Sequence, residues 1–375
     1  MAEIRVDQLT KTFGSLRAVD DVSFTFPDGQ VTCLLGPSGC GKTTLMRIIA
    51  GLEQQTSGAV YFGDQNVSRL SPSKRNIGMV FQYPVVYRGI SVYRNIELPL
   101  QSLKLSKAER TRRVEEAIHL MGLTASASTE VGKLDNGTRQ KVSVAREVAR
   151  QPQFMLFDEP ITNVDANAKL QLKRSLKELT RALRQTTVYV THDQTEAMTL
   201  ADQIALMRDG KIVQCAPPRE LYNHPADRFG GWFLGNPGMV FFHATIAGDA
   251  ESRVLASPLF ASPVAVVGAI PGMSEVTIGI RPEHIRVSGE PLSDGVPALL
   301  ERKTIQIGGQ YLVSLAVAGL SEHGFKAKVA PSAGERLPAS GPVFVELPLD
   351  RITLFDAHGD KIAATLQPAQ VPVAR

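Results

Sequence analysis

The sequence predicts an α/β protein with a parallel sheet, followed by a second domain that is all β. In the first part, short apolar strands alternate with helical stretches, which is typical of a parallel sheet covered by helices. After about residue 236, helical periodicity disappears and short β-type runs separated by Gly, Pro and Ser take over. We therefore expect one domain over residues 1–235 and a second over residues 236–375.

The first domain opens with two β-like runs, IRVDQL and VSFTF, before the apolar run VTCLL at Val31–Leu35. A glycine-rich turn joins VTCLL to the helical pattern TTLMRIIAGL, so the local order is strand, loop, helix. GAVYF and NIGMVF predict further strands, and a mostly helical insert is expected over about residues 83–150. Within the insert, a capping box of Ser106 and Glu109 predicts the start of a helix that runs to Leu120.

The strands return after the insert. FMLF and TTVYV flank the helical stretch 166–183, and IALMRDGKIVQ predicts a hairpin that turns at Asp209-Gly210. In the second domain, the β-type runs are VTIGI, IRVSG, YLVSLAV and VFVEL.

Composition narrows the classes of protein that the chain can represent. Its 375 residues carry a net charge of +4 with both signs interspersed, so no concentrated patch for nucleic acid is expected. Cys33, Cys40 and Cys215 are too few and scattered for a disulfide framework or a metal cluster, which favours a reducing compartment. The longest apolar stretch, near residues 263–270, is far shorter than the roughly 20 residues of a spanning helix. We expect any membrane role to act through a partner.

The motif G-x-x-x-x-G-K-[ST] occurs at residues 36–43, between a predicted strand and a predicted helix. Its glycines let successive backbone N–H groups surround phosphate oxygens, and the helix amino end adds partial positive charge. We expect Lys42 to reach the β and γ phosphates and the Thr43 hydroxyl to hold Mg²⁺. The predicted nucleotide-binding residues of this phosphate loop are Gly36, Pro37, Ser38, Gly39, Cys40, Gly41, Lys42, Thr43 and Thr44.

The stretch FMLFDEP supplies the carboxylates that such a site needs. Asp158, at the end of an apolar strand, is expected to support the metal. Glu159 is expected to orient or deprotonate the attacking water beside the γ phosphate. An acidic turn at a strand end is the alternative interpretation.

These motifs together resemble the ATP-binding cassette family. The phosphate loop, Gln82 after a strand, LFDEP, NVDA with Asp165, and VTHD with His192 occur in that family's order within the first 235 residues. The resemblance implies that Gln82 touches Mg²⁺ and relays the state of the nucleotide to the helical insert. It also implies that Asp165 faces a second subunit and that His192 contacts the γ phosphate as a catalytic residue. Taken singly, a surface glutamine, a helix cap and a satisfied histidine remain open alternatives.

Two further residues are singled out around the nucleotide. Phe13 lies where this family stacks an aromatic ring on adenine, with burial in the core as the alternative. Cys40 lies inside the phosphate loop, where a helix amino end would lower the pKa of the thiol. We therefore expect alkylation of Cys40 to block ATP binding.

The helix that begins at Leu134 departs from the family's signature, which is normally LSGGQ. Here the residues are Leu134, Asp135, Asn136, Gly137 and Thr138. Asp135 would place a carboxylate at a helix end that binds phosphate from the opposite subunit, and Asn136 adds bulk. The preferred interpretation is pairing with a second, different ATPase rather than a homodimer. The alternative is that Asp135 is simply a good N-cap in a tolerant site.

The second domain indicates the branch of the family. TIGIRPEHIRV and FVELPLDRITLFD resemble the OB-like (TOBE-type) regulatory domain of ATPases that energise import of carbohydrates, polyols or glycerol phosphate. RPEH could instead be a turn with an exposed charged cluster.

The resemblance implies an ATPase that binds ATP and Mg²⁺ and lies peripherally on the cytoplasmic face of the cell inner membrane. It implies membrane permease partners, an extracytoplasmic solute-binding protein that acts indirectly, and no nucleic acid. The alternatives are a soluble non-transport ATPase of the same family and a mainly regulatory nucleotide-binding module. Which cargo is carried, with glycerol among the polyols, stays open.

Overall fold

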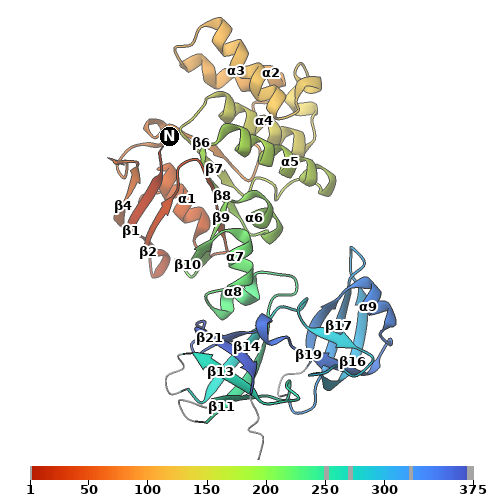
Figure 1. The fold of residues 1–375 in the computed structure, drawn as a ribbon. Helices are drawn as coiled ribbons and strands as arrows, with labels where there is room; N and C mark the ends of the chain where they lie inside the picture. The colour runs from red at the N-terminus through yellow and green to blue at the C-terminus, as the bar shows by residue number, and fades with distance from the viewer. Residues whose placement is uncertain (1, 249–252, 269–272, 321–323, 370–375) are drawn as a thin grey trace, which may run out of the picture. The chain divides into compact units, whose positions relative to one another are not determined.

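The computed structural model describes residues 2–248, 253–268, 273–320 and 324–369. Their contacts divide the chain into two compact units, Met1–Leu221 and Tyr222–Arg375 (Figure 1). The α/β fold followed by a β-rich region is confirmed. The expected boundary between residues 235 and 236 stays a prediction.

The first unit contains a six-stranded sheet of order β10-β9-β3-β8-β7-β6, in which all neighbours are parallel except the β9/β10 hairpin. Every residue of β3, β7 and β8 is buried, which fits their continuous apolar or Thr-rich runs. The strands are β3 (Val31–Leu35), β6 (Ile77–Val80), β7 (Phe154–Asp158), β8 (Thr186–Thr191), β9 (Gln203–Arg208) and β10 (Lys211–Ala216). The hairpin expected at Asp209-Gly210 is confirmed.

A second sheet in this unit is antiparallel, with order β2-β1-β4-β5. Its strands are β1 (Ile4–Phe13), β2 (Leu16–Phe26), β4 (Ser57–Phe62) and β5 (Gln65–Asn66). Helix α1 (Lys42–Ala50) contributes Leu45, Ile48 and Ile49 to the core that these strands share with the large sheet.

The helical insert contains α2 (Val92–Glu97), α3 (Lys107–Leu120) and α4 (Asn136–Ala149), which pack together (Figure 1). Ser106 caps α3 by accepting from the Glu109 N–H at 3.1 Å, as the sequence predicted. The Glu109 carboxylate instead accepts hydrogen bonds from Arg112 and Arg113, so the reciprocal half of the capping box is replaced by ion pairs. The remaining helices of the unit, α5 (Ala166–Leu183) and α6 (Gln194–Leu200), follow the insert.

The second unit has two antiparallel sheets around one apolar core. The six-stranded sheet has the order β20-β14-β11-β12-β13-β21 and the five-stranded sheet the order β15-β19-β16-β17-β18. Its strands are β11 (Val240–Ala247), β12 (Val254–Ala256), β13 (Val264–Gly268), β14 (Glu275–Ile280), β15 (Arg286–Ser288), β16 (Val296–Ile305), β17 (Tyr311–Ala316), β18 (Phe325–Val329), β19 (Gly341–Glu346), β20 (Thr353–Phe355) and β21 (Ala364–Pro368). Short helices α8 (Arg228–Phe233) and α9 (Pro331–Arg336) also belong to it, and α7 (Pro218–Asn223) ends in its first residues.

The interpretation of RPEH as an exposed charged cluster is wrong for Arg281, whose side chain is 2% exposed. Its guanidinium donates to the backbone carbonyls of Gly231 (2.8 Å), Tyr222 (2.6 Å) and Leu234. It also lies over the Tyr222 ring, with Cζ 3.9 Å from the ring centroid. Arg281 therefore ties the segment around α8 to the end of β14.

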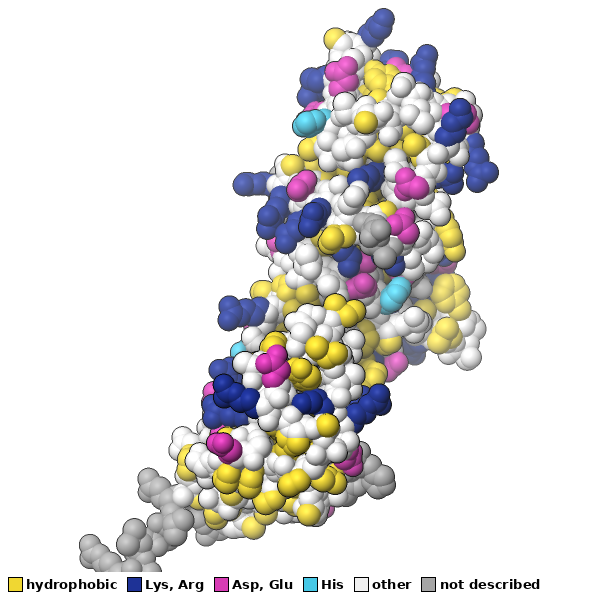
Figure 2. Space-filling model, turned by 90° about the vertical axis from the view of Figure 1, so that its right-hand side faces the viewer, with side chains coloured by type: hydrophobic (Ala, Val, Ile, Leu, Met, Phe, Trp, Pro, Cys, Tyr) yellow, Lys and Arg dark blue, Asp and Glu magenta, His cyan; other side chains and the backbone are white. Residues whose placement is uncertain are grey.

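Basic and acidic side chains are interspersed on the face drawn in Figure 2, as the mixed composition predicts. Among the described residues, no helix is long and apolar enough to cross a membrane.

Candidate functional site

The phosphate loop joins the buried strand β3 to the first turn of α1. Its backbone requires glycine at two positions in particular. Gly41, the N-cap of α1, has φ of 105°, and a Cβ there would lie 2.1 Å from the Ala18 carbonyl oxygen. Gly36 would meet the Met207 carbonyl oxygen at 2.3 Å if it carried a Cβ. The loop is thus held against neighbouring backbone, with its shape fixed by packing as well as by conformational freedom.

Lys42 lies under the loop and is 5% exposed. Its Nζ donates to the carbonyl oxygens of Gly36 and Pro37, each at 2.8 Å. These acceptors are neutral, so neither hydrogen bond pairs the ammonium with a negative charge. The positive charge of the ammonium is suited to an incoming phosphate, and the expected contact with the β and γ phosphates stays a prediction.

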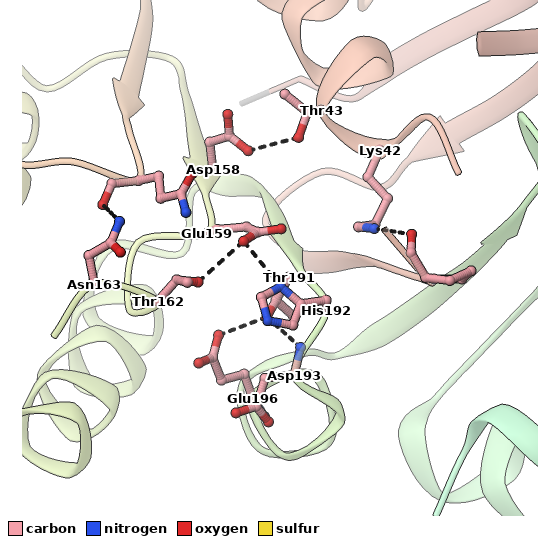
Figure 3. Close-up of polar contacts among 12 residues, drawn as sticks. Lys42, Thr43, Asp158, Glu159, Thr162, Asn163, Thr191, His192, Asp193 and Glu196 are labelled. Atoms are coloured by element: carbon pink, nitrogen blue, oxygen red, sulfur yellow. Dashed lines mark hydrogen bonds and ion pairs between the residues drawn. The ribbon is translucent and has the colours of Figure 1, made fainter. Parts of the chain in front are cut away.

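Thr43 and Asp158 come together from α1 and the end of β7. The Thr43 hydroxyl donates to Asp158 Oδ1 at 3.2 Å (Figure 3). Burial raises the pKa of the Asp158 carboxyl, while the Thr43 hydrogen bond opposes that shift. One carboxylate and one hydroxyl, both hard oxygen donors, fit the way Mg²⁺ binds in sites where phosphates and water supply the other ligands. Among the described residues, no cluster of three or more His, Cys, Asp or Glu could form an all-protein metal cage.

Glu159 lies beside this pair and faces His192 at the end of β8. Its Oε2 is 3.1 Å from His192 Nδ1 and accepts from the Thr162 hydroxyl at 3.2 Å (Figure 3). The backbone of Glu159 has φ of 46°, a region that non-glycine residues seldom occupy, and its N–H donates to the Val190 carbonyl at 3.0 Å. This unusual turn directs the Glu159 carboxylate toward the same space as His192.

A buried carboxylate behind His192 was missed by the sequence analysis. Glu196, 4% exposed, accepts from the Thr191 hydroxyl at 2.9 Å and from Tyr189 at 3.0 Å. Asp193 caps the same helix, α6, through the N–H groups of Thr195 and Glu196. The D-x-x-E spacing of a helix start was the signal that could have found this pair. The network fixes the chain on both sides of His192.

Comparisons with known proteins agree with this geometry. The family model described as "ABC transporter" matches residues 19–162. The chain is 40% identical to the sn-glycerol-3-phosphate import ATP-binding protein of Ruegeria pomeroyi, over 97% of this chain and 100% of that protein. It is 39% identical to the trehalose/maltose import ATP-binding protein of Thermococcus litoralis, over 86% of this chain and 90% of that protein.

The chain belongs to the ABC transporter family. A solved component of a Clostridium perfringens ABC transporter complex superposes with a TM-score of 0.55 at 25% identity, over 59% of this chain and 90% of that one. The named relatives are import ATP-binding proteins, which confirms the predicted importer branch. The chain is therefore an ATP-binding subunit of the family, and its chemistry is ATP hydrolysis coupled to transport.

Gln82, expected in this family to relay the state of the nucleotide, begins the connection from β6 into the helical insert. Its backbone carbonyl accepts from Asn163 Nδ2 at 3.4 Å. The preceding carbonyl, of Phe81, accepts from Gln140 of α4 at 2.8 Å. The segment is thus tied both to the NVDA motif and to the insert, which is the connection that a relay requires. Contact of Gln82 with Mg²⁺ stays a prediction.

Helix α4, which begins in the ABC signature, is capped by Asp135, the residue that replaces the serine of the family's usual signature. Its Oδ1 accepts from the Thr138 N–H at 2.9 Å and its Oδ2 from the Thr138 hydroxyl at 2.6 Å. Partial burial opposes ionisation, but the hydrogen bonds from Thr138 prevail and hold the pKa of Asp135 below its usual value. The N-cap alternative is correct as local structure. It does not remove the negative charge, which stays at the amino end of α4.

Gly137, the one glycine in the signature of this chain, lies in close contact with α5. A Cβ at this position would lie 2.7 Å from the Cβ of Ala168 in α5. Asp165 caps α5 by accepting from the Ala168 N–H at 3.0 Å. Both helix starts line a cavity of about 250 Å³, together with Lys141. The expected position of Asp165 opposite a second subunit stays a prediction.

Phe13 is 46% exposed at the end of β1, so the alternative of core burial is wrong. The stacking of its ring on adenine stays a prediction. Lys11 Nζ lies 4.7 Å from its ring centroid.

The expected lowering of the Cys40 pKa is wrong. Its side chain is buried, and burial raises the pKa of the thiol despite the nearby Lys42 ammonium. A neutral, inaccessible thiol reacts slowly, so Cys40 acts as a small apolar residue under the loop.

Proposed function

We propose that this chain is the ATP-hydrolysing subunit of an importer for a carbohydrate, a polyol or glycerol phosphate. The observation that carries the proposal is the convergence of Glu159 and His192 on the phosphate loop, next to the Thr43 and Asp158 pair. The names of the relatives, which include glycerol-3-phosphate and trehalose/maltose import proteins, support the cargo class.

Each residue of the site has a role in this proposal. Lys42 and the loop N–H groups bind the triphosphate, and Phe13 stacks on the adenine. Thr43, Asp158 and Gln82 hold Mg²⁺, which supplies charge neutralisation at the phosphates. Glu159 accepts a proton from, or orients, the attacking water, and His192 holds the Glu159 carboxylate in place and contacts the γ phosphate.

The connection at Gln82 passes the state of the nucleotide to the helical insert. The insert contacts membrane permease subunits, and the chain works as a peripheral protein on the cytoplasmic face of the inner membrane. An extracytoplasmic binding protein selects the cargo, so the cargo itself does not contact this chain. Binding and hydrolysis of ATP act as the switch between two arrangements of the transporter.

Pairing with a second, different ATPase is the finer part of the proposal. It is supported by the charged state of Asp135, since a carboxylate at the amino end of α4 repels phosphate from an opposite subunit. The chain's own phosphate loop, Asp158 and Glu159 would meet a standard signature on the partner. The site opposite Asp135 would bind ATP and hydrolyse it poorly.

Reconstitution tests the proposed function. The chain is expressed with candidate permease subunits and a candidate binding protein, and the purified complex is assayed for ATPase activity with sugars, sugar alcohols and glycerol phosphate. We expect co-purification with the permeases and stimulation by one cargo class, which Glu159→Gln abolishes. A complex that forms but hydrolyses ATP independently of every cargo would contradict the transport function.

A further inference from the structure

A cavity lined by residues of the second unit alone has an excess of positive charge. It has a volume of about 280 Å³ and lies between the end of α7, the turn after β14, and the segments on either side of β20. That volume is just below the range of roughly 300–1,000 Å³ for pockets that hold drug-sized ligands, so the occupant must be small. The charged and imidazole side chains that line it are His224, Arg281, His284, Asp350, Arg351 and Lys361.

The permanent charges of this lining do not cancel. Arg281, Arg351 and Lys361 are cationic and Asp350 is the one carboxylate among the lining residues, which leaves an excess of two positive charges. Asp350 is already paired with its neighbour, since Arg351 Nε lies 3.1 Å from Asp350 Oδ2. The charges of Arg281 and Lys361 are therefore the ones available to a ligand.

Arg281 gives the cavity a fixed positive wall. Its terminal nitrogens are held by neutral backbone carbonyls, and its Nε, also buried, has no hydrogen-bond partner. Keeping a guanidinium 98% buried on neutral acceptors is costly unless a counter-charge lies nearby. Glu283 supplies part of that counter-charge, because it opposes the lowering of the Arg281 pKa by burial, but its carboxylate accepts from the Tyr222 hydroxyl at 2.5 Å and does not line the cavity.

His284 adds a second buried polar atom at this wall, since its Nδ1 has no hydrogen-bond partner. Burial lowers the pKa of His284; Glu283 opposes that shift, while Arg351 and Arg281 act with burial. A neutral imidazole can donate one hydrogen bond to an oxyanion without adding a charge. Lys361, by contrast, is exposed and can move to cover an occupant.

We propose that this cavity binds a small, doubly charged oxyanion of the phosphate type, either inorganic phosphate or the phosphate group of a small monoester. The ligand's two negative charges match the excess of the lining, and its oxygens accept from Lys361 and from the Arg281 and His284 wall. Occupation would stabilise the contact between the RPEH turn and the segment that Arg281 holds. The second unit would thereby sense a phosphate compound, independently of the cargo and of ATP hydrolysis.

Calorimetric titration of the full chain at constant ionic strength tests the proposal, with sodium phosphate, sn-glycerol 3-phosphate and uncharged glycerol as probes. Lys42→Ala is the background that disables the phosphate loop. In that background we expect heat from at least one phosphate probe and none from glycerol. Binding of inorganic phosphate alone, or preference for the ester, identifies the source of the ligand.

Two charge reversals on exposed residues locate the site. Lys361→Glu should weaken binding by about tenfold or more, because it removes a charge-assisted contact and adds a repulsive one. Lys326→Glu, the same change at an exposed position of β18 outside the lining, should leave binding unchanged. The proposal is overturned if neither probe gives heat at millimolar concentration, if heat disappears in Lys42→Ala, or if both reversals weaken binding equally. Because the readout is binding rather than turnover, failure here leaves the transport function standing.

Discussion

Replacement of Asp135 by asparagine separates the charge of this residue from its role as a helix cap. In the native chain the Thr138 N–H donates to Asp135 Oδ1 at 2.9 Å. Asp135→Asn keeps an oxygen that can accept this hydrogen bond, and Asn and Asp are similarly good N-caps. The substitution removes the negative charge that the hydrogen bonds of Thr138 maintain. The folded structure should therefore be retained while the electrostatics of the signature change.

The size of the effect follows from Coulomb's law. At about 4 Å and an effective dielectric constant of about 20, a pair of like charges costs about 4 kcal/mol before screening. If salt and Mg²⁺ leave only about a third of that, roughly 1.4 kcal/mol remains, which corresponds to about tenfold in an equilibrium or a rate. We expect the homodimer of Asp135→Asn to hydrolyse ATP about tenfold faster than the native homodimer.

Asp135→Ala is the matched control, since it removes both the charge and the cap. It should lower the stability of the first unit by about 1 kcal/mol, while Asp135→Asn leaves it nearly unchanged. The assays are phosphate release by the purified homodimer at saturating ATP and urea unfolding of the same samples. Native hydrolysis rates in both variants would refute the electrostatic reasoning and with it the case for a different partner ATPase.

Three further predictions concern residues away from the signature. Arg281→Ala leaves three backbone carbonyls without their donor and should cost about 3 kcal/mol of stability. Arg286→Ala, which breaks an exposed ion pair, is the control and should cost less than about 1 kcal/mol of stability. Equal urea midpoints for the Arg281→Ala and Arg286→Ala variants would count against the anchoring role of Arg281. Mass spectrometry after treatment with a thiol reagent at pH 8 should find Cys40 unmodified until the chain unfolds, and rapid modification would contradict its burial. Hydrogen bonds from Arg112 and Arg113 lower the pKa of Glu109 from its usual value of 4.5 to about 2. The ion pairs of Glu109 therefore stabilise the fold fully above pH 4.5, and this stabilisation is lost as the pH falls towards 2. The difference in urea midpoint between the native chain and Glu109→Gln should shrink over that range, and a constant difference would show that the ion pairs contribute nothing.

Local sequence patterns predicted the strands and helices of the first unit and the residues that lie close together in the nucleotide site. Continuous apolar runs predicted the buried strands β3 and β7, and Ser106 marked the start of α3. The approach of Thr43 to Asp158 follows from topology, because parallel strands present their carboxyl ends at one edge of the sheet. These features depend on spacing along the chain, which a single sequence contains.

Features that depend on distant backbone were not predicted. The burial of Cys40 comes from packing beneath the phosphate loop, which outweighs the helix end that the sequence shows. The positive φ of Glu159 depends on its hydrogen bond to β8, and the burial of Arg281 on carbonyls about 50 residues away. No local pattern of residues encodes such contacts, so the polar networks behind the site were found only in three dimensions.

Calorimetric titration with ATP tests most directly whether the loop at residues 36–43 holds a nucleoside triphosphate. The native chain, Lys42→Ala and Thr44→Ala are titrated with ATP in the presence and absence of Mg²⁺. We expect Mg²⁺-dependent binding by the native chain that weakens by about tenfold or more in Lys42→Ala, because a charge-assisted phosphate contact is lost. Native affinity in folded Lys42→Ala, or no heat from the native chain, would contradict the function assigned to this loop.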